Sequence, residues 1–201
     1  MGTSMVLQNL LRKESTANKK VSIDRSVLER LLRGSDRQLN MINSLLEAQS
    51  TATMGIRLNL QPCQIHQLID AILLELEPIL QQNGVVVNNR VTDLPIVNAD
   101  PLQLWRVLNN LITNAFKHNP HGIELTIDAT TDRGFIQIYI IDNGIGIDPQ
   151  QQARLFELYA RGDRARYMPG LGMGLYLCQQ IILAHGGEIG FDSYPNYGSI
   201  F

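Results

Sequence analysis

The stretch FIQIYIIDNGIGI, residues 135–147, combines two patterns. Its first part reads as a strand with a side-chain period of two, and the strand delivers Asp142 at its end. Gly144 and Gly146 follow directly, and glycine lets a backbone adopt positive φ and approach a flat ligand closely. We therefore expect the carboxylate at a cavity between the sheet and the next loop, where it can accept a hydrogen bond from an exocyclic amine such as that of adenine.

A second glycine cluster, Gly170, Gly172 and Gly174, leads into an apolar helix within GLGMGL. Free N–H groups and the positive end of the dipole at a helix start can bind a phosphate. The cluster lacks the upstream strand of a dinucleotide-binding fingerprint, because a basic loop precedes it, and no Lys-Ser or Lys-Thr follows it as in a Walker motif. With Asp142, it predicts a site for a purine and its phosphates.

A third group of polar residues lies on one predicted helix, which begins at Pro101 with Asp100 as its cap. Asn110, Asn114 and Lys117 are spaced by four and three residues, so they share one face. Amide oxygens can ligate Mg²⁺ beside nucleotide phosphates, and a lysine neutralises phosphate charge. The alternative is a set of solvent-facing or capping asparagines, although asparagine has a poor helix propensity.

The remaining patterns predict the fold class. Helical periodicity covers 65–84, 101–119, 148–159 and 171–187, and strand patterns cover 56–61, 85–91, 95–99, 123–132, 135–142, 187–193 and 198–201. The strands at 123–132 and 135–142 form a predicted hairpin. This order is typical of an α+β two-layer sandwich, in which three long helices cover one face of a mixed sheet.

The first quarter of the chain has a different pattern, with helices expected at 5–14 and 27–49. In the second of these an a/d seam runs along the helix, formed by Leu28, Leu32, Ser35, Leu39, Ile42 and Leu46. The helix could pack on its own domain, but we favour a helical hairpin that forms a homodimer. The predicted domains are therefore a partial hairpin at 1–52 and a catalytic domain at 53–201.

Composition excludes several other classes. The chain has 201 residues, a net charge of -2 and 44% hydrophobic residues, which suits one globular domain with an appendage. It has no concentrated basic face for nucleic acid, no apolar run long enough to span or contact a membrane, and no secretory signal. Cys63 and Cys178 lack metal spacing, so we expect free buried thiols and a cytoplasmic location.

Taken together, the motifs resemble those of sensor histidine kinases of two-component systems. NNLITNAFKHN is similar to the N box, DNGIGI to the first G box, LFELYARGD to the F box and GLGMGL to the second G box. The resemblance runs from about Arg57 to the end of the chain. It implies the Bergerat ATP-binding fold, shared with gyrase, the MutL mismatch-repair ATPases and a heat-shock chaperone, and ATP with Mg²⁺ as ligands.

The resemblance also assigns roles to residues. It implies that Asp142 binds the adenine amine, that Asn114 ligates Mg²⁺, and that Asn110, Lys117 and Arg161 act on the phosphates as catalytic residues. Phe156 would anchor a lid formed by residues 157–170. Tyr159 would lie near the base or the lid hinge, or serve as a core aromatic, and His118 stands where the family more often has an aromatic residue. The remaining implied contacts are Gly144, Gly146, Ile147, Gly170, Leu171, Gly172, Met173, Gly174 and Leu175.

One substitution separates kinase from hydrolase. Related ATPases use a glutamate one helical turn before the metal-binding asparagine as general base, and here that position is Asn110, whose amide cannot take a proton. Transfer to a histidine, whose imidazole offers a lone pair at neutral pH, is therefore expected over hydrolysis. The alternatives are a degenerate nucleotide-binding regulatory or dimerisation module and, third, a hydrolysing ATPase.

The expected phosphoryl acceptor is a histidine on the first helix of the hairpin, which would pass the group to the receiver domain of a response regulator. None of the four histidines, His66, His118, His121 and His185, has the acceptor's sequence context. We expect the acceptor to precede residue 1, so that this stretch alone does not phosphorylate itself.

Overall fold

The computed structural model describes residues 24–92, 94–158 and 172–201. The chain divides after Glu47 into two compact units, and each is described by itself. Within the described ranges, no helix is both long and apolar enough to cross a membrane. The expected helix at 5–14 lies outside the described residues.

The first unit contributes most of helix α2, Arg25–Met54. The helix is longer at both ends than the predicted 27–49. Its predicted seam is exposed in this chain, since the five apolar side chains are 48–60% exposed: Leu28, Leu32, Leu39, Ile42 and Leu46. A row of exposed apolar side chains at a/d spacing is typical of a helix that packs against another helix.

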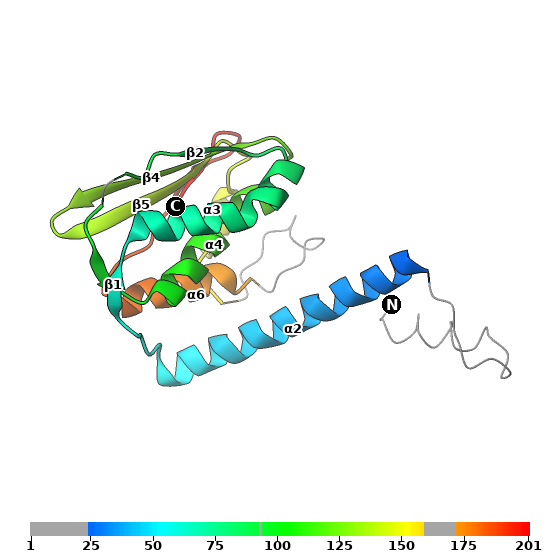
Figure 1. The fold of residues 1–201 in the computed structure, drawn as a ribbon, viewed down its shortest axis with the longest axis horizontal. Helices are drawn as coiled ribbons and strands as arrows, with labels where there is room; N and C mark the ends of the chain where they lie inside the picture. Colours follow the sequence, from blue (N-terminus) through cyan, green and yellow to red (C-terminus); the bar gives the residue numbers. More distant parts are fainter. Residues whose placement is uncertain (1–23, 93, 159–171) are drawn as a thin grey trace, which may run out of the picture. The chain divides into compact units, whose positions relative to one another are not determined.

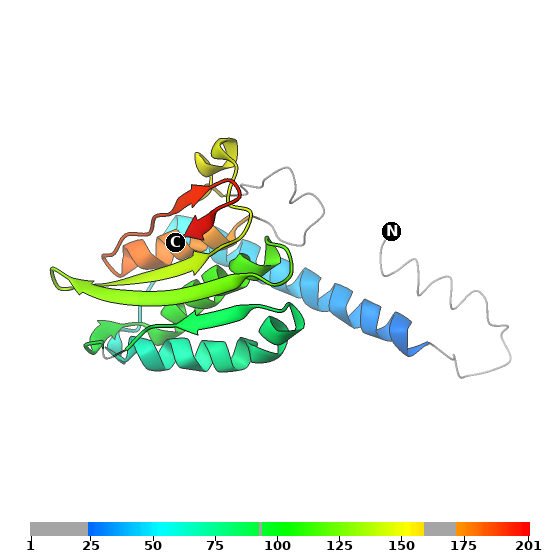
Figure 2. The same cartoon turned by 90° about the horizontal axis from the view of Figure 1, so that it is seen from above.

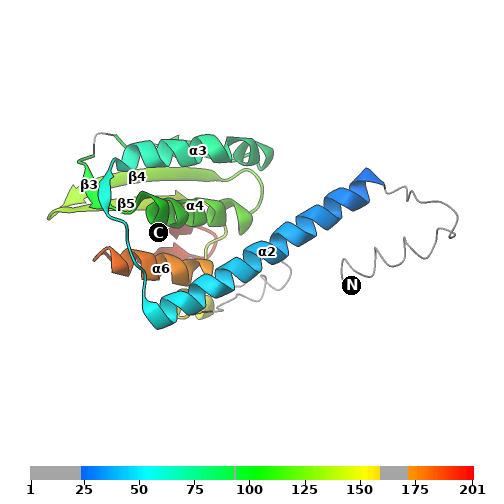
Figure 3. The same cartoon turned by 60° about the horizontal axis from the view of Figure 1, so that its bottom comes forward.

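The second unit is the predicted two-layer α+β sandwich. A five-stranded mixed sheet has the order β2-β4-β5-β7-β6, and three helices lie side by side against one of its faces (Figures 1 and 3). The strands are β2 Val86–Asn89, β4 Glu124–Asp132, β5 Phe135–Asp142, β6 Asp192–Tyr194 and β7 Gly198–Ile200. Only β2 and β4 are parallel, and Figure 2 shows the sheet from the side opposite the helices.

The helices begin and end close to the predicted positions. Helix α3, Ile65–Gln82, is capped by Asn83 and followed by Gly84 at φ 64°, the left-handed conformation that the predicted C-terminal glycine supplies. Helix α4, Pro101–Lys117, begins with the predicted Asp100 cap, and α6 covers Gly174–Ala184. Helix α4 packs against both α3 and α6, so it holds the middle of the helical layer.

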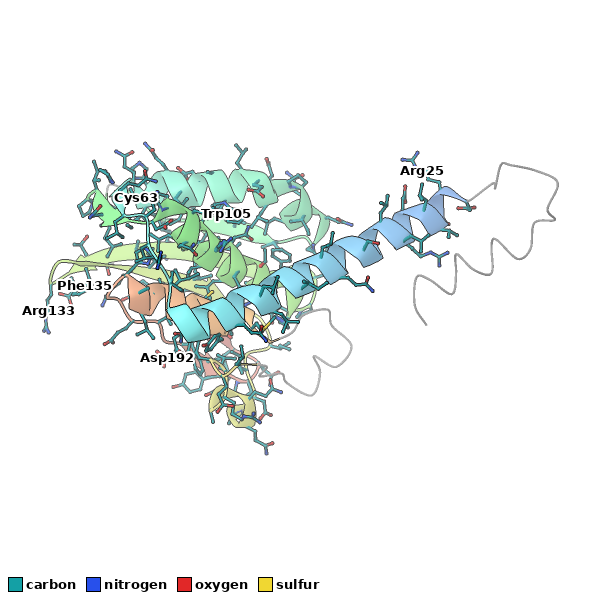
Figure 4. All side chains as sticks on the ribbon, turned by 90° about the horizontal axis from the view of Figure 1, so that it is seen from below. Arg25, Cys63, Trp105, Arg133, Phe135 and Asp192 are labelled. Carbon is teal, nitrogen blue, oxygen red and sulfur yellow. The ribbon has the colours of Figure 1, made fainter. Side chains whose placement is uncertain are left out.

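The β4–β5 hairpin is confirmed, and its turn is formed by Arg133 and Gly134. Both have positive φ, 48° and 85°, as a two-residue turn that matches the strand twist requires. Figure 4 shows Arg133 and Phe135 at the exposed tip of this hairpin. The other end of β5 carries Asp142, so the carboxylate lies at the opposite end of the strand from the hairpin turn.

Three predicted elements are wrong in extent. The strand expected at 56–61 is instead β1, Gln61–Cys63, which pairs with β3, Val97–Ala99, in a separate two-stranded sheet. Residues 56–60 form no ladder, because the N–H of Asn59 donates to the Asp100 carboxylate at 2.8 Å. The strand expected at 187–193 is shorter and begins later, since β6 covers only Asp192–Tyr194.

The helix expected at 148–159 is also shorter. Asp148 caps α5, Pro149–Gln152, as predicted, but the helix ends after four residues. Beyond it the backbone bonds run from residue i to residue i−3, as in Leu155 N to Gln152 O at 3.2 Å, so the segment tightens into successive turns.

Candidate functional site

Asp142 is held at the end of β5 by neighbours on both sides. It faces Leu125 of β4 and Ser199 of β7 in the ladders and is only 6% exposed. Its Oδ1 accepts hydrogen bonds from Asn119 Nδ2 at 2.8 Å and Gly144 N at 2.9 Å. Burial raises the pKa of this carboxyl, while the donors Gly144, Asn119 and Ser199 oppose the shift. A carboxylate has about four lone-pair sites, so acceptor capacity remains for a ligand amine.

The first glycine turn is packed against protein as well as being predicted to face a ligand. A Cβ at Gly144 would overlap the Asn119 amide, and one at Gly146 would overlap the carbonyl of Tyr194. Gly146 has the predicted positive φ, 67°, whereas Gly144 does not. These close approaches supply a reason for both glycines that requires no ligand, so their contact with a base stays a prediction.

The loop after these glycines is tied to the β6–β7 hairpin. Ile147 N donates to Ser193 Oγ at 2.9 Å, and Gln152 Nε2 donates to both the Ile147 and Ser193 carbonyl oxygens at 2.9 Å. Ser193 Oγ in turn donates to Gly198 O at 3.0 Å and lies 2.9 Å from Ser199 Oγ. These bonds keep the loop that carries Gly144 and Gly146 in register with the strand that carries Asp142.

The polar face of α4 differs from residue to residue. Asn110 is half-buried, and its Nδ2 donates to Cys178 Sγ at 3.1 Å. Asn114 is also half-buried, and its side chain forms no hydrogen bond with any other described residue. Lys117 is exposed at the C-terminal end of the helix, yet displacement of water by the surrounding protein lowers the pKa of its ammonium.

The start of α6 has no side-chain cap among the described residues. Met173 precedes the helix and provides no capping side chain, so the first N–H groups have no side-chain partner there. Gly172 has φ 68°, and a Cβ at Gly174 would lie 2.6 Å from Asn110 Oδ1. The glycines thus bring the helix start against the middle of α4, beside Asn110.

Several predicted contacts use their side chains for packing. Met173 is 2% exposed, and Leu175 packs against the hydrophobic core, so their contact with a ligand stays a prediction. His118 ends α4, and its N–H donates to Asn114 O at 3.2 Å. Loss of hydrating water, and then the nearby Lys117 charge, lowers the pKa of the exposed His118 ring.

The structure describes only the start of the predicted lid. Phe156 packs against Phe191 with ring centroids 6.0 Å apart, and Phe191 packs against Phe201 at 5.9 Å. This row of rings anchors the segment that leaves α5. The predicted lid residues Tyr159 and Arg161, with Gly170 and Leu171 of the second glycine cluster, lie outside the described residues.

Asn119 was not among the predicted site residues. Its Nδ2 donates to Ala115 O at 2.7 Å as well as to Asp142, and its Oδ1 accepts from Ile145 N at 2.9 Å. An asparagine directly after a helix and before a proline, as in KHNP, was the available signal, because asparagine often satisfies the last carbonyls of a helix. The partners across the fold had no sequence signal.

The arrangement fits a magnesium-nucleotide. Its described residues provide a buried acceptor at the end of β5, a start of α6 without a side-chain cap, and on α4 an amide, that of Asn114, with no hydrogen-bond partner among them. No cluster of three His, Cys, Asp or Glu side chains able to hold a metal occurs in the described part of the chain. A magnesium ion here would take Asn114 as its protein ligand, with the rest of its coordination shell from phosphate and water.

Comparison with known proteins shows the family to which the chain belongs. Residues 99–201 match the family of histidine kinase-, DNA gyrase B- and HSP90-like ATPases. The chain is 34% identical over 165 residues to the adaptive-response sensory kinase SasA of Rippkaea orientalis, covering 80% of this chain and 42% of that protein. It is 31% identical over 162 residues to the sensor protein KdpD of Escherichia coli, covering 80% of this chain and 18% of that protein. The chain spans less than half the length of these relatives.

Solved structures share the fold. The mycobacterial sensor histidine kinase MprB superposes with a TM-score of 0.60 at 31% identity, over 70% of this chain and 93% of that one. Full-length ShkA, crystallised with AMPPNP, superposes with a TM-score of 0.79 at 24% identity, over 99% of this chain and 41% of that one. ThkA, crystallised with the response regulator TrrA, superposes with a TM-score of 0.70 at 14% identity, over 99% of this chain and 55% of that one.

Proposed function

Because the chain belongs to the family of histidine kinase-, DNA gyrase B- and HSP90-like ATPases and carries a catalytic domain homologous to the sensor kinases SasA and KdpD, we propose that it binds ATP with Mg²⁺ and transfers the γ-phosphoryl group to a histidine. The acceptor lies on a dimerisation helix, and the group then passes to an aspartate of a response-regulator receiver domain. The observation that carries the proposal is that α4 contacts both glycine-flanked positions: Asn119, just after the helix, donates to Asp142 Oδ1 at 2.8 Å, and Asn110 within it lies against Gly174 at the start of α6.

Each group has a distinct task in this proposal. Asp142 accepts a hydrogen bond from the adenine amine, and the N–H groups at the start of α6 bind phosphate oxygens. Asn114 holds Mg²⁺, which would neutralise charge on the phosphates. Lys117 and Arg161 bind the phosphate that is transferred. The lowered pKa of Lys117 is compatible with this role, because bound phosphate restores the favourable surroundings that its ammonium lacks.

Asn110 supports transfer over hydrolysis. Its amide has no basic lone pair with which to deprotonate water, and its Nδ2 is already engaged by Cys178 at 3.1 Å. A histidine acceptor needs no such base, because a neutral imidazole offers its own lone pair. We therefore expect slow release of free phosphate by this chain and efficient transfer to a suitable imidazole.

A homodimer through α2 and a receiver-domain partner complete the proposal. The exposed seam of α2, defined by Leu28, Leu32, Leu39, Ile42 and Leu46, supports helix pairing. ThkA, which shares this fold, was crystallised with a response regulator. His185 is not available as an acceptor, since its Nε2 accepts from Asp100 N at 3.0 Å and its Nδ1 lies 2.8 Å from Ile181 O.

The first test is calorimetric titration of the whole chain with a non-hydrolysable ATP analogue, with and without Mg²⁺. We expect Mg²⁺ to strengthen binding by roughly tenfold or more, and Asn114→Ala to abolish that gain because the metal loses its protein ligand. Asn109→Ala is the matched control, as it removes a half-buried asparagine from another face of the same helix. A magnesium effect that survives Asn114→Ala would disprove the metal assignment.

The second test distinguishes a kinase from the other classes. The chain is mixed with ATP and a kinase-inactive dimerisation domain that carries an acceptor histidine, and acid-labile label on that histidine is measured. Labelling supports the proposal, whereas rapid steady phosphate release would instead support a hydrolysing ATPase. Nucleotide binding with neither outcome would identify a regulatory binding module.

A further inference from the structure

Asn119 connects three parts of the site through one amide. It follows the C-terminal end of α4, where its Nδ2 donates to Ala115 O at 2.7 Å. The same nitrogen donates to Asp142 Oδ1 at 2.8 Å, and its Oδ1 accepts from Ile145 N at 2.9 Å. An asparagine amide carries two N–H donors, so both are used here. The amide therefore has little freedom to turn.

The glycine turn encloses this amide. A Cβ at Gly144 would overlap the amide carbon, oxygen and nitrogen of Asn119. Gly144 N also donates to Asp142 Oδ1 at 2.9 Å, so two donors converge on the same carboxylate oxygen. Asp142 itself is only 6% exposed. These contacts fix both the position and the plane of the carboxylate.

We propose that Asn119 is a positioning residue that sets the purine specificity of the site. By holding Asp142 Oδ1, it directs the remaining acceptor capacity of the carboxylate at the 6-position of a bound purine. This inference rests on the proposed function, in which Asp142 meets the base. It predicts preference for a 6-amino purine, which donates there, over a 6-oxo purine, which presents an acceptor.

The physical reason is a matter of orientation. A carboxylate can only accept, so at a fixed position it repels a 6-oxo group. Hypoxanthine also carries a donor at N1–H, next to its oxo group. A carboxylate that is free to turn can move to that donor and bind the wrong base. Removing Asn119 is therefore expected to relax the discrimination more than it weakens the binding of ATP.

A merely structural role for Asn119 predicts something else. The bond to Ala115 O satisfies a carbonyl at the end of α4, and its loss alone would loosen the helix end. Asn83 makes the same bond at the end of α3, where its Nδ2 donates to Ile79 O at 2.7 Å. Asn83→Ala is thus a matched control that removes the helix-end bond but leaves the Asp142 carboxylate untouched.

The experiment measures the dissociation constants of ATP and of inosine triphosphate for the whole chain, with Mg²⁺ present. We expect the wild-type ratio to favour ATP by at least about tenfold and Asn119→Ala to reduce that ratio by about tenfold, since hydrogen bonds to charged groups have effects of this size. Asn83→Ala should leave the ratio unchanged. In an Asp142→Asn background, Asn119→Ala should cause no further change in the ratio.

The outcomes separate this inference from the function on which it rests. If the wild-type chain binds neither nucleotide, the proposed function fails. If it binds ATP selectively and Asn119→Ala keeps that selectivity, the positioning role alone is overturned. Should Asn119→Ala unfold, Asn119→Leu serves instead, because it keeps the approximate side-chain size but cannot donate to Asp142. Retained selectivity in that variant would also overturn the inference.

Discussion

At the scale of single residues, Asp142 is subject to two opposing effects. Burial raises its pKa, and the donors Gly144, Asn119 and Ser199 stabilise the ionised form. The net shift is upward, so the folded protein binds a proton at Asp142 more readily than the unfolded chain does. Ionisation of this group therefore reduces stability as pH rises through the raised pKa, which is a stability cost at the nucleotide site.

This shift predicts a pH dependence of nucleotide affinity. As pH falls, Asp142 becomes protonated above the ordinary aspartate value of about 3.9 and its affinity for the adenine amine declines. Calorimetric titrations from about pH 7 down to about pH 4.5 measure this decline. Asp142→Asn is the reference variant. Its affinity changes with the protonation of the nucleotide phosphates, as that of the wild type does, but it has no carboxyl to protonate at residue 142. The ratio of the wild-type affinity to the affinity of this variant should fall toward one as pH falls. A ratio that stays constant would contradict the assignment of Asp142 to the adenine amine.

Residue spacing predicted the polar face of α4 but not the hydrogen bonds that Asn119 and Gly144 donate to Asp142. Asn110, Asn114 and Lys117 could be assigned to one face because helix geometry converts spacings of four and three into neighbouring positions, and their roles toward a ligand stay predictions. Asn119 was missed because its partners lie 23 and 26 residues away, across the β4–β5 hairpin. The role of Cys178 as hydrogen-bond acceptor for Asn110 spans 68 residues and is likewise fixed only by the packing of α6 on α4.

At the scale of elements, the first turn of α4 depends on Asp100. Its Oδ1 accepts from Leu102 N at 3.0 Å and Gln103 N at 3.1 Å, and its Oδ2 accepts from Asn59 N at 2.8 Å. Its own N–H donates to His185 at the end of α6. Burial alone would raise the pKa of Asp100, but the donors from Asn59, Gln103 and Leu102 lower it below its ordinary value.

We predict that Asp100→Ala lowers the free energy of unfolding by about 2–4 kcal/mol, because it removes a helix cap and leaves the Asn59 N–H without its acceptor. Chemical denaturation measures the loss. Asp148→Ala is the matched control, since Asp148 is an exposed cap that accepts from Gln150 N at 2.8 Å, and it should cost less than about 1 kcal/mol. Equal losses in the two variants would contradict the bridging role of Asp100.

The lowered pKa of Asp100 also predicts how its contribution to stability changes with pH. An acid whose folded pKa lies below its unfolded value stabilises the fold above the unfolded pKa, and the stabilisation is lost as pH falls through the folded value. Asp100→Asn keeps an acceptor oxygen but cannot ionise. The difference in stability between the wild type and Asp100→Asn should therefore be largest near neutral pH and decrease below about pH 4.

Elements with local signals were predicted best. Helices α3 and α4 carry an apolar period with a glycine or a capped proline at one end, and the β4–β5 hairpin carries its own turn residues. The failures were elements whose extent is set by distant partners. Residues 56–60 alternate like a strand, but the Asn59 N–H donates to the Asp100 carboxylate. Helix α5 ends after four residues, and Gln152 donates to the Ser193 carbonyl oxygen of β6.

At the scale of the whole second unit, both cysteines belong to one core. Cys63 of β1 and Cys178 of α6 are 5% and 2% exposed and lie in the same hydrophobic cluster, together with side chains from the three long helices and the two central strands, such as Ile69, Ile72, Leu108, Ile112, Leu125, Ile127, Ile140 and Ile181. Because a single core joins every layer, we expect this unit to unfold in one cooperative step.

Thiol labelling tests that cooperativity in the unmodified protein, since its sequence holds only these two cysteines. Burial raises the pKa of both thiols, that of Cys178 to about 11, so the folded protein contains little reactive thiolate. Labelling should therefore follow unfolding, and mass spectrometry of the two peptides should give the same unfolding free energy and the same denaturant dependence for each. Labelling of unfolded chain supplies the intrinsic rates. If Cys63 reacts with a much smaller denaturant dependence than Cys178, the β1–β3 sheet opens separately, and the single cooperative core is disproved.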